Sequence, residues 1–243
     1  MTKSIIVTGA SSGIGNATAR LFLDHGWTVG LVARSADPLE ALADQYDTAV
    51  ALPADVTNES HIDAAFDAFV DQTGHLDALF NNAGIIGPQT TIDEISLDDF
   101  QQVQNVNVTG MFLAARAAFR HMRHQSPQGG RIINNGSISA YMPRPGSTCY
   151  TTSKHAITGL TRTLSLDGRP MNIACGQIDI GNAETDMITE LNTRLAAAGE
   201  DPVPTIDVLD AAKSVLHMAN LPLNANVLFM TVMANQMPYV GRG

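Results

Sequence analysis

Three side chains that could exchange protons with a substrate occur close together, in the stretch GSISAYMPRPGSTCYTTSKH at residues 136–155. Tyr150 and Lys154 are four residues apart, and side chains at that spacing share one face of a helix. Ser137 comes thirteen residues before Tyr150 and needs the fold to bring it near. Taken alone, a tyrosine and a lysine at this spacing are more often a packed ring beside a solvated cation.

The chemistry that suits these three groups is proton transfer coupled to hydride transfer. Reduction of a carbonyl delivers hydride to carbon and a proton to oxygen, so the proton donor must touch the developing alkoxide. A free tyrosine titrates at about 10. A lysine cation about 4 Å away, at an effective dielectric of about 20, favours a phenolate by roughly 4 kcal/mol. Lys154 is therefore expected to make Tyr150 a usable acid, and Ser137 to donate to the substrate oxygen.

A glycine-rich turn near the N-terminus predicts a dinucleotide site. The segment TGASSGIG, residues 8–15, follows an apolar strand and opens directly into a helix. Its glycines let backbone NH groups approach a pyrophosphate, which the positive end of the helix attracts. Such turns also serve packing alone, but the position between strand and helix favours binding. The predicted contacts in this turn are Gly9, Ser11, Ser12, Gly13, Ile14 and Gly15.

The residues after the second apolar strand bear on the choice between NAD and NADP. NAD-selective folds usually carry an acid here, which binds both ribose hydroxyls, whereas this chain has Ala33, Arg34 and Ser35. A guanidinium can pair with a 2′-phosphate and a serine can donate to it. NADP is therefore the expected cofactor and NAD the alternative; the competing interpretation of Arg34 is a solvated surface arginine.

Further cofactor contacts are expected after the third and fourth strands. Asp55, with Val56 beside it, can accept a hydrogen bond from an adenine amino group, although an aspartate here can equally serve as a turn residue. Small residues follow the fourth strand, where backbone must run against a ribose; they are Asn82, Ala83 and Gly84. With the nicotinamide so placed, the Lys154 ammonium can also donate to its ribose.

Short apolar runs alternate with amphipathic ones along the whole chain. The predicted strands are 4–8, 28–33, 48–52, 76–81, 131–135, 172–175 and 226–232. The predicted helices are 13–25, 37–46, 59–73, 97–124, 149–167 and 207–220. Strands that are apolar on both faces indicate a buried parallel sheet. The sequence therefore predicts one α/β domain over residues 1–243, with a doubly wound, Rossmann-like sheet between two helix layers. Residues 176–206 read as an irregular insertion, with a substrate lid at about 183–205.

Composition excludes several classes of partner. The formal net charge is −10 and no dense basic run occurs, so nucleic acid is not an expected partner. No apolar stretch reaches the roughly 18 residues of a membrane span, and the N-terminus does not resemble a signal peptide. The only cysteines, Cys149 and Cys175, lack metal-ligand spacing, as do the seven histidines. A reducing, cytoplasmic setting and no metal site are expected.

The motifs together carry a resemblance to a known family. TGASSGIG, NNAG, NVNVTG, the spacing from Ser137 to Tyr150 and YTTSK occur in the order found in short-chain dehydrogenases/reductases of the short, single-domain branch. The resemblance covers essentially the whole chain. It implies a seven-stranded Rossmann-like sheet, NAD(P)-dependent oxidation or reduction, and a catalytic set of Ser137, Tyr150, Lys154 and an asparagine. The matching asparagine is Asn107, which is implied to help hold a water that links Lys154 to solvent.

The chain departs from the family pattern after the sixth strand. The family commonly has Pro-Gly there, followed by a branched apolar residue and a threonine two residues later. In this chain the corresponding run is ACGQIDIGNAETDM. If Gly176 and Gln177 stand in place of Pro-Gly, Gly181 occupies the position of the threonine. Ile178 and Ile180 are then the expected backbone contacts of the nicotinamide carboxamide.

The expected substrate is a small to mid-sized carbonyl or secondary alcohol. Its pocket is expected from residues 85–91, 138–149 and 183–200, where apolar side chains outnumber charged ones. The apolar residues singled out there are Ile85, Ile86, Met142, Met187 and Leu191. Arg144 could receive an acidic group, but a surface turn is the preferred interpretation.

Two further expectations concern assembly and competing functions. In the resembled family the two long helices, here 97–124 and 149–167, commonly pair between subunits, so a homodimer or homotetramer is expected. The main alternative function is a catalytically silent, dinucleotide-binding redox sensor, but such relatives typically lose the tyrosine or the lysine. An epimerase or dehydratase acting on a nucleotide sugar usually needs a longer substrate domain than 243 residues allow.

Overall fold

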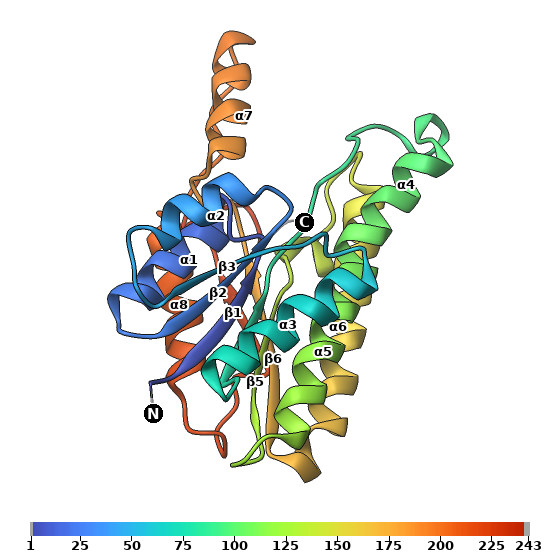
Figure 1. Ribbon diagram of the computed structural model, residues 1–243. Coiled ribbons are helices and arrows are strands. Elements are labelled where there is room, and N and C mark those ends of the chain that lie inside the picture. The colour runs from blue at the N-terminus through green and yellow to red at the C-terminus, as the bar shows by residue number, and fades with distance from the viewer. Residues whose placement is uncertain (1, 241–243) are drawn as a thin grey trace.

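The architecture is a parallel sheet of seven strands between two layers of helices (Figure 1), as the sequence predicts. A computed structural model describes residues 2–240, apart from the side chain of Met187. The strands are β1 (Ser4–Thr8), β2 (Thr28–Ala33), β3 (Ala49–Pro53), β4 (Ala78–Asn81), β5 (Gly130–Asn135), β6 (Ile173–Ile180) and β7 (Phe229–Val232).

The α-helices of the described chain are α1 (Gly13–Asp24), α2 (Ala36–Ala43), α3 (Glu59–Thr73), α4 (Leu97–Gln104), α5 (Met111–His124), α6 (Thr148–Asp167), α7 (Asp186–Ala197) and α8 (Val208–Asn220). A π-helical segment, Asn105–Gly110, joins α4 to α5, and short 3₁₀ turns occupy Ile92–Glu94, Ile138–Ala140 and Arg169–Met171. The predicted helix 97–124 is therefore interrupted by one wide turn.

The strand order is β3-β2-β1-β4-β5-β6-β7, with every pairing parallel. The order reverses direction between β1 and β4, and the loops that leave the carboxyl ends of these two strands therefore diverge. That divergence opens the crevice in which open α/β sheets bind ligands. The glycine-rich turn after β1 and the NNAG segment after β4 meet at this point.

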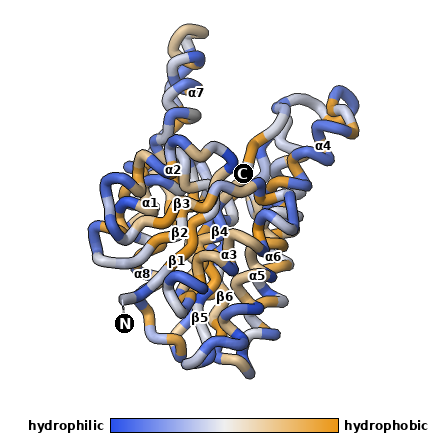
Figure 2. The backbone as a smooth tube through the Cα atoms, in the orientation of Figure 1, coloured by the Kyte–Doolittle hydropathy of each residue, from blue (hydrophilic) through white to orange (hydrophobic). Residues whose placement is uncertain are grey.

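Alternate residues of the strands build two separate cores. Ile5 and Val7 of β1 face α1, α2 and α8, whereas Ile6 between them faces α3 and α5. Figure 2 shows the hydrophobic strands at the centre of the molecule and hydrophilic residues concentrated on the outer helices and loops. Both faces of the sheet are covered, which explains why the strands read as continuous apolar runs.

The sixth strand corrects the prediction of an irregular insertion over 176–206. β6 continues to Ile180, where Gln177 and Asp179 pair in register with β7. Their polar side chains concealed the strand, because they are buried in hydrogen bonds rather than packed in an apolar core. The same insertion also contains helix α7, which projects from the body of the molecule (Figure 1) and occupies most of the predicted lid.

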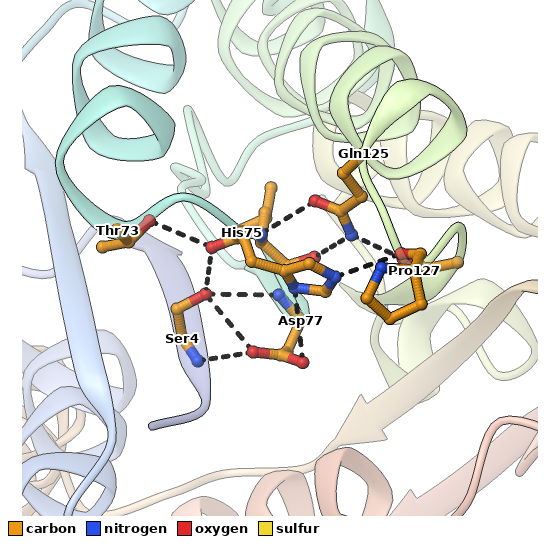
Figure 3. Close-up of polar contacts among 8 residues, drawn as sticks. Ser4, Thr73, His75, Asp77, Gln125 and Pro127 are labelled. Carbon is orange, nitrogen blue, oxygen red and sulfur yellow. Dashed lines mark hydrogen bonds and ion pairs between the residues drawn. The ribbon is translucent and has the colours of Figure 1, made fainter. Parts of the chain in front are cut away.

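A polar network ties the chain together at the amino end of the sheet (Figure 3). The Ser4 NH donates to Asp77 Oδ2 at 2.8 Å, and the Ser4 hydroxyl donates to the carbonyl of His75. The His75 ring contacts Asp77 Oδ1 at 3.5 Å and the Pro127 carbonyl at 3.2 Å. Since its two nitrogens face these groups, the histidine does not act on the serine hydroxyl. This Ser–His–Asp group therefore fixes loops at the end of the sheet opposite the candidate site.

Candidate active site

A cleft of about 800 Å³ lies at the carboxyl ends of the strands and gathers most of the predicted site residues. Those that line it are Gly9, Ser11, Ser12, Gly13, Ile14, Arg34, Asp55, Val56, Asn82, Ala83, Gly84, Ser137, Tyr150, Lys154 and Ile180. The predicted residues that do not line it are Gly15, Ser35, Asn107 and Ile178.

The glycine-rich turn provides a cradle for a phosphate group. Gly9 has φ +71°, a left-handed conformation, and a Cβ there would lie 2.9 Å from the side chain of Asn82. Ser12 precedes α1 without a side-chain cap, which leaves the first NH groups of the helix for a ligand. Gly15 serves packing instead, because a Cβ there would lie 2.1 Å from the Gly9 carbonyl oxygen.

Tyr150 and Lys154 lie on one face of α6 and reach the same cleft. The Lys154 Nζ atom is 5.4 Å from the centre of the Tyr150 ring, and it donates to the Asn135 carbonyl at 2.8 Å. Only 3% of Lys154 is exposed. Its cation is therefore held near the phenol rather than spread into solvent, in agreement with the arrangement that the spacing predicts.

Ser137 follows β5 and enters the same cleft, so the fold supplies the proximity that spacing alone could not. Its Oγ atom accepts a hydrogen bond from the Ser139 NH at 3.1 Å. No acceptor for its own hydroxyl hydrogen occurs among the described residues. The hydroxyl is therefore able to donate to a substrate oxygen.

Asn107 lies in the π-helical segment and is completely buried. Its Oδ1 atom accepts from the Ile85 NH, and its Nδ2 atom donates to the Ile85 carbonyl, both at 2.8 Å. Nδ2 also donates to Ser153 Oγ at 3.0 Å. The side chain thus fixes the loop after β4 and does not line the cleft beside Lys154.

The residues predicted to contact the adenosine part of a cofactor are arranged as follows. Arg34 is exposed and lines the cleft, whereas Ser35 precedes α2 and does not. Asp55 Oδ1 accepts from both the backbone NH and the hydroxyl of Thr57, at 2.9 and 2.8 Å. The Thr57 NH, with help from the Arg34 cation, lowers the pKa of Asp55. Oδ1 of Asp55 therefore stabilises the turn that contains Thr57, whereas Oδ2 can accept a hydrogen bond from a ligand.

The prediction for Ile178 is wrong, and the register behind it must be shifted. Ile178 is fully buried in the core beneath α8, because it lies within β6 rather than after it. The strand ends at Ile180, and the turn that meets the cleft begins at Gly181. Counted from this glycine, the threonine of the family pattern is Thr185, which lines the cleft and lies beside Gly13. The threonine is therefore present, four residues later than predicted.

The part of the cleft that the sequence assigns to the substrate is more polar than predicted. Ile85 and Ile86 line it as expected, but Met142 and Leu191 do not, and the Met187 side chain lies outside the described structure. Apolar contacts from Ile138 and Ile188 take their place. Polar residues that the sequence did not indicate also line the cleft, as does Arg144; they are Asp98, Gln101, Gln102 and Asn105.

Both cysteines are buried. Burial raises the pKa of the Cys149 thiol, and it raises that of Cys175 to about 12. A thiol of this kind is a poor nucleophile, since the thiolate is the reactive form. Cys149, although next to Tyr150, is therefore a small packed side chain.

The fold and cleft define a dinucleotide-binding α/β protein with a Ser–Tyr–Lys group beside the nucleotide crevice. The family model described as short chain dehydrogenase matches residues 3–196. The chain belongs to the short-chain dehydrogenase family, an oxidoreductase family. It is 38% identical over 194 residues to a 2-(R)-hydroxypropyl-CoM dehydrogenase of Xanthobacter autotrophicus, a match that covers 77% of each chain.

Solved structures confirm the fold. A 3-ketoacyl-(acyl-carrier-protein) reductase from Brucella melitensis complexed with NADH superimposes with a TM-score of 0.85 at 26% identity, covering 96% of this chain and 97% of that one. ElxO with NADP bound superimposes with a TM-score of 0.86 at 25% identity, with the same coverage. No described helix is both long and apolar enough to cross a membrane.

Proposed function

We propose that this chain is an NADP(H)-dependent oxidoreductase that transfers hydride between the nicotinamide and a small to mid-sized carbonyl or secondary alcohol. The observation that carries the proposal is the placement of Tyr150 and Lys154 on one helix face, 5.4 Å from Nζ to ring centre, in the cleft that also contains the glycine-rich turn. The dehydrogenase and reductase named above support the reaction class.

The residues present fit a dinucleotide. The crowding around Gly9 and the uncapped start of α1 match a pyrophosphate, and Asn82 and Ala83 border the same space. When bound, the cofactor supplies or accepts the hydride. Lys154 is placed to donate to its ribose, and Thr185, Asn182 and Ile180 line the part of the cleft after β6.

The chain's own residues manage the proton. In the reductive direction Tyr150 gives its hydroxyl proton to the substrate oxygen as the carbonyl carbon is reduced, while Ser137 donates a hydrogen bond to the same oxygen. The Lys154 cation stabilises the phenolate that results. In the oxidative direction the phenolate takes the hydroxyl proton of the alcohol back.

The proposal is tested by turnover. Purified protein should oxidise NADPH with at least one member of a panel of ketones and aldehydes, or reduce NADP with the matching alcohols. Tight NADPH binding without turnover on any member would contradict the proposal and favour the silent redox sensor.

The NADP preference rests on Arg34, an exposed cation that lines the cleft directly after β2. NAD-selective folds usually carry an acid at this position, and this chain does not. Arg34→Asp removes the partner of a 2′-phosphate and adds an acceptor for ribose hydroxyls. We expect the Kd for NADPH to rise roughly 10- to 100-fold, and the ratio of NADPH to NADH affinity to reverse. Titration of intrinsic or nicotinamide fluorescence measures both constants.

Arg20→Asp is the matched control for this substitution. Arg20 is an exposed arginine of α1 that pairs with Asn16 and Gln45 and does not line the cleft. It should leave both dissociation constants within about twofold. Wild-type protein that binds NADH more tightly than NADPH would contradict the role given to Arg34.

We also propose a homodimer or homotetramer. Phe112 of α5 and Leu166 of α6 are about half exposed, at 47% and 57%, on the two helices that the sequence marks for pairing. Covering such side chains on a second copy removes apolar surface from water. Sedimentation equilibrium would contradict this proposal if it gave the mass of a single chain.

A further inference from the structure

A completely buried carboxyl group lies directly beneath the catalytic serine. Asp179 is 0% exposed on β6, in a sheet whose interior is otherwise mostly apolar. Its Oδ1 atom accepts the Ser137 NH at 2.8 Å and the Gln177 Nε2 group at 2.7 Å. Its Oδ2 atom has no hydrogen-bond partner among the described residues. Burying a carboxyl in this way costs stability unless it is compensated, so its position calls for a reason.

The orientation of this carboxyl is fixed from below by a ladder of amides. Asn81, Asn134 and Gln177 lie side by side on β4, β5 and β6, and all three are buried. Asn134 donates to Thr161 Oγ1 at 2.9 Å, and that hydroxyl donates to Gln177 Oε1 at 3.2 Å. The Gln177 oxygen is thereby engaged, and its NH₂ group is turned to Asp179.

The loop above packs against the carboxylate without a side chain between them. A Cβ on Gly136 would lie 2.1 Å from Asp179 Oδ1 and 2.5 Å from Gln177 Nε2. The Gly136 NH donates to the Ile178 carbonyl at 2.8 Å. Two consecutive NH groups, those of Gly136 and Ser137, are thus tied to β6 immediately before the catalytic hydroxyl.

One cation and one neutral hydroxyl group act on Asp179. The Lys154 cation of α6 and the Tyr141 hydroxyl in the loop after Ser137 both favour its ionised form, whereas Gly136 of the β5 loop and Thr231 of β7 carry no charge. Burial is the largest influence and raises the pKa of Asp179, while the hydrogen bonds from Gln177 and Ser137 oppose it.

We propose that Asp179 is a positioning residue: its Oδ1 atom holds the Ser137 backbone NH and so fixes where the Ser137 hydroxyl meets the substrate oxygen. This role rests on the proposed function, because it concerns the oxygen that is reduced or oxidised. It assigns a purpose to the polar residues that interrupt β6. It also explains the requirement for glycine at position 136.

The first test is a double-mutant cycle on kcat. Asp179→Ala removes the acceptor and should lower kcat about 10- to 100-fold, since displacement of a catalytic group by about 1 Å can have such an effect. In a Ser137→Ala background the same substitution should lower kcat less than threefold, because the hydroxyl that Asp179 positions is already gone. Equal losses in the two backgrounds would overturn the proposal.

Two further variants separate positioning from loss of stability. Asp179→Asn keeps an oxygen at Oδ1 and should restore kcat to within about threefold of wild type. Ser4→Ala removes a buried hydroxyl at the opposite end of the sheet, where it donates to the His75 carbonyl, and should lower the thermal midpoint while leaving kcat nearly unchanged. An asparagine variant as slow as the alanine variant would overturn the role given to the hydrogen bond.

A readout without turnover distinguishes failure of this inference from failure of the proposed function. Amide hydrogen exchange of the segment 130–141 should accelerate at Ser137 in Asp179→Ala and stay slow in Asp179→Asn. Faster exchange in a protein that turns over no carbonyl would contradict the proposed function and still support the contact. Unchanged exchange in the alanine variant would overturn the inference.

Discussion

Replacing Tyr150 by phenylalanine should lower kcat for carbonyl reduction about 10³-fold, with the affinity for NADPH nearly unchanged. The substitution removes only the phenolic oxygen, and general acid–base groups typically contribute 10²- to 10⁴-fold. The ring still fills its place on α6 beside Lys154, and the glycine-rich turn that we propose as the cofactor site is untouched. A loss confined to kcat is the signature of a group that acts in the transition state.

Tyr46→Phe is the control for that experiment. The Tyr46 hydroxyl donates to Asp24 at 2.8 Å, on exposed surface outside the cleft. Its loss should leave kcat within twofold. Steady-state rates of NADPH oxidation, together with fluorescence titration of the cofactor, measure both variants. Retention of more than a tenth of wild-type kcat by Tyr150→Phe would remove the tyrosine as the proton donor.

Local patterns predicted the parts of this site that depend on local geometry. The four-residue spacing of Tyr150 and Lys154 places both on one helix face, whatever lies around the helix. The turn from Gly9 to Gly13 could also be predicted, because the glycine at position 9 marks a left-handed backbone conformation. The structure adds that a Cβ there would meet Asn82. The fold class could be predicted because strands that are apolar on both faces indicate a buried parallel sheet.

Predictions that depended on where a strand ends were less secure. The run through Gln177 and Asp179 resembles a loop in sequence, because polar residues normally mark loops. In the structure Gln177 donates to Asp179 Oδ1 within the sheet, and Gln177 also forms hydrogen bonds with Thr161 and Thr158 of α6, so the strand continues. Because the end of β6 was predicted too early, the carboxamide contact was assigned to Ile178, which lies inside the strand, and Thr185 was not recognised as the threonine of the family pattern.

Roles that depend on a hydrogen-bond partner far along the chain could not be read from the sequence. Asn107 was placed in the catalytic set by resemblance. Only the coordinates show that both the oxygen and the nitrogen of its side-chain amide form hydrogen bonds with the backbone of Ile85, twenty-two residues earlier. The contact between Asp179 and the Ser137 NH spans forty-two residues and leaves no local pattern. The second contact is defined by the pairing of β5 with β6, and the first by the packing of the π-helical segment against the loop after β4.

Replacing Lys154 by methionine should lower kcat roughly 10²- to 10³-fold, and it should also weaken NADPH binding. Methionine keeps an unbranched chain of similar length in a position that is 3% exposed, so packing is largely retained. A unit charge about 4 Å from a phenolate is worth roughly 4 kcal/mol at an effective dielectric of about 20, which sets the upper end of the expected loss. Binding weakens because a ribose donor is removed, and this double effect separates Lys154 from Tyr150.

A double-mutant cycle tests whether Lys154 acts through the phenol. In a Tyr150→Phe background, Lys154→Met should lower kcat far less than it does in the wild-type background, because the phenolate that the cation stabilises no longer forms. Lys213→Met is the control, since Lys213 forms an exposed ion pair with Asp210 on α8 and lies outside the cleft. Equal losses in the two backgrounds would show that the lysine acts only as a ribose ligand, because a charge that assists the tyrosine has nothing left to assist once the phenolic oxygen is removed.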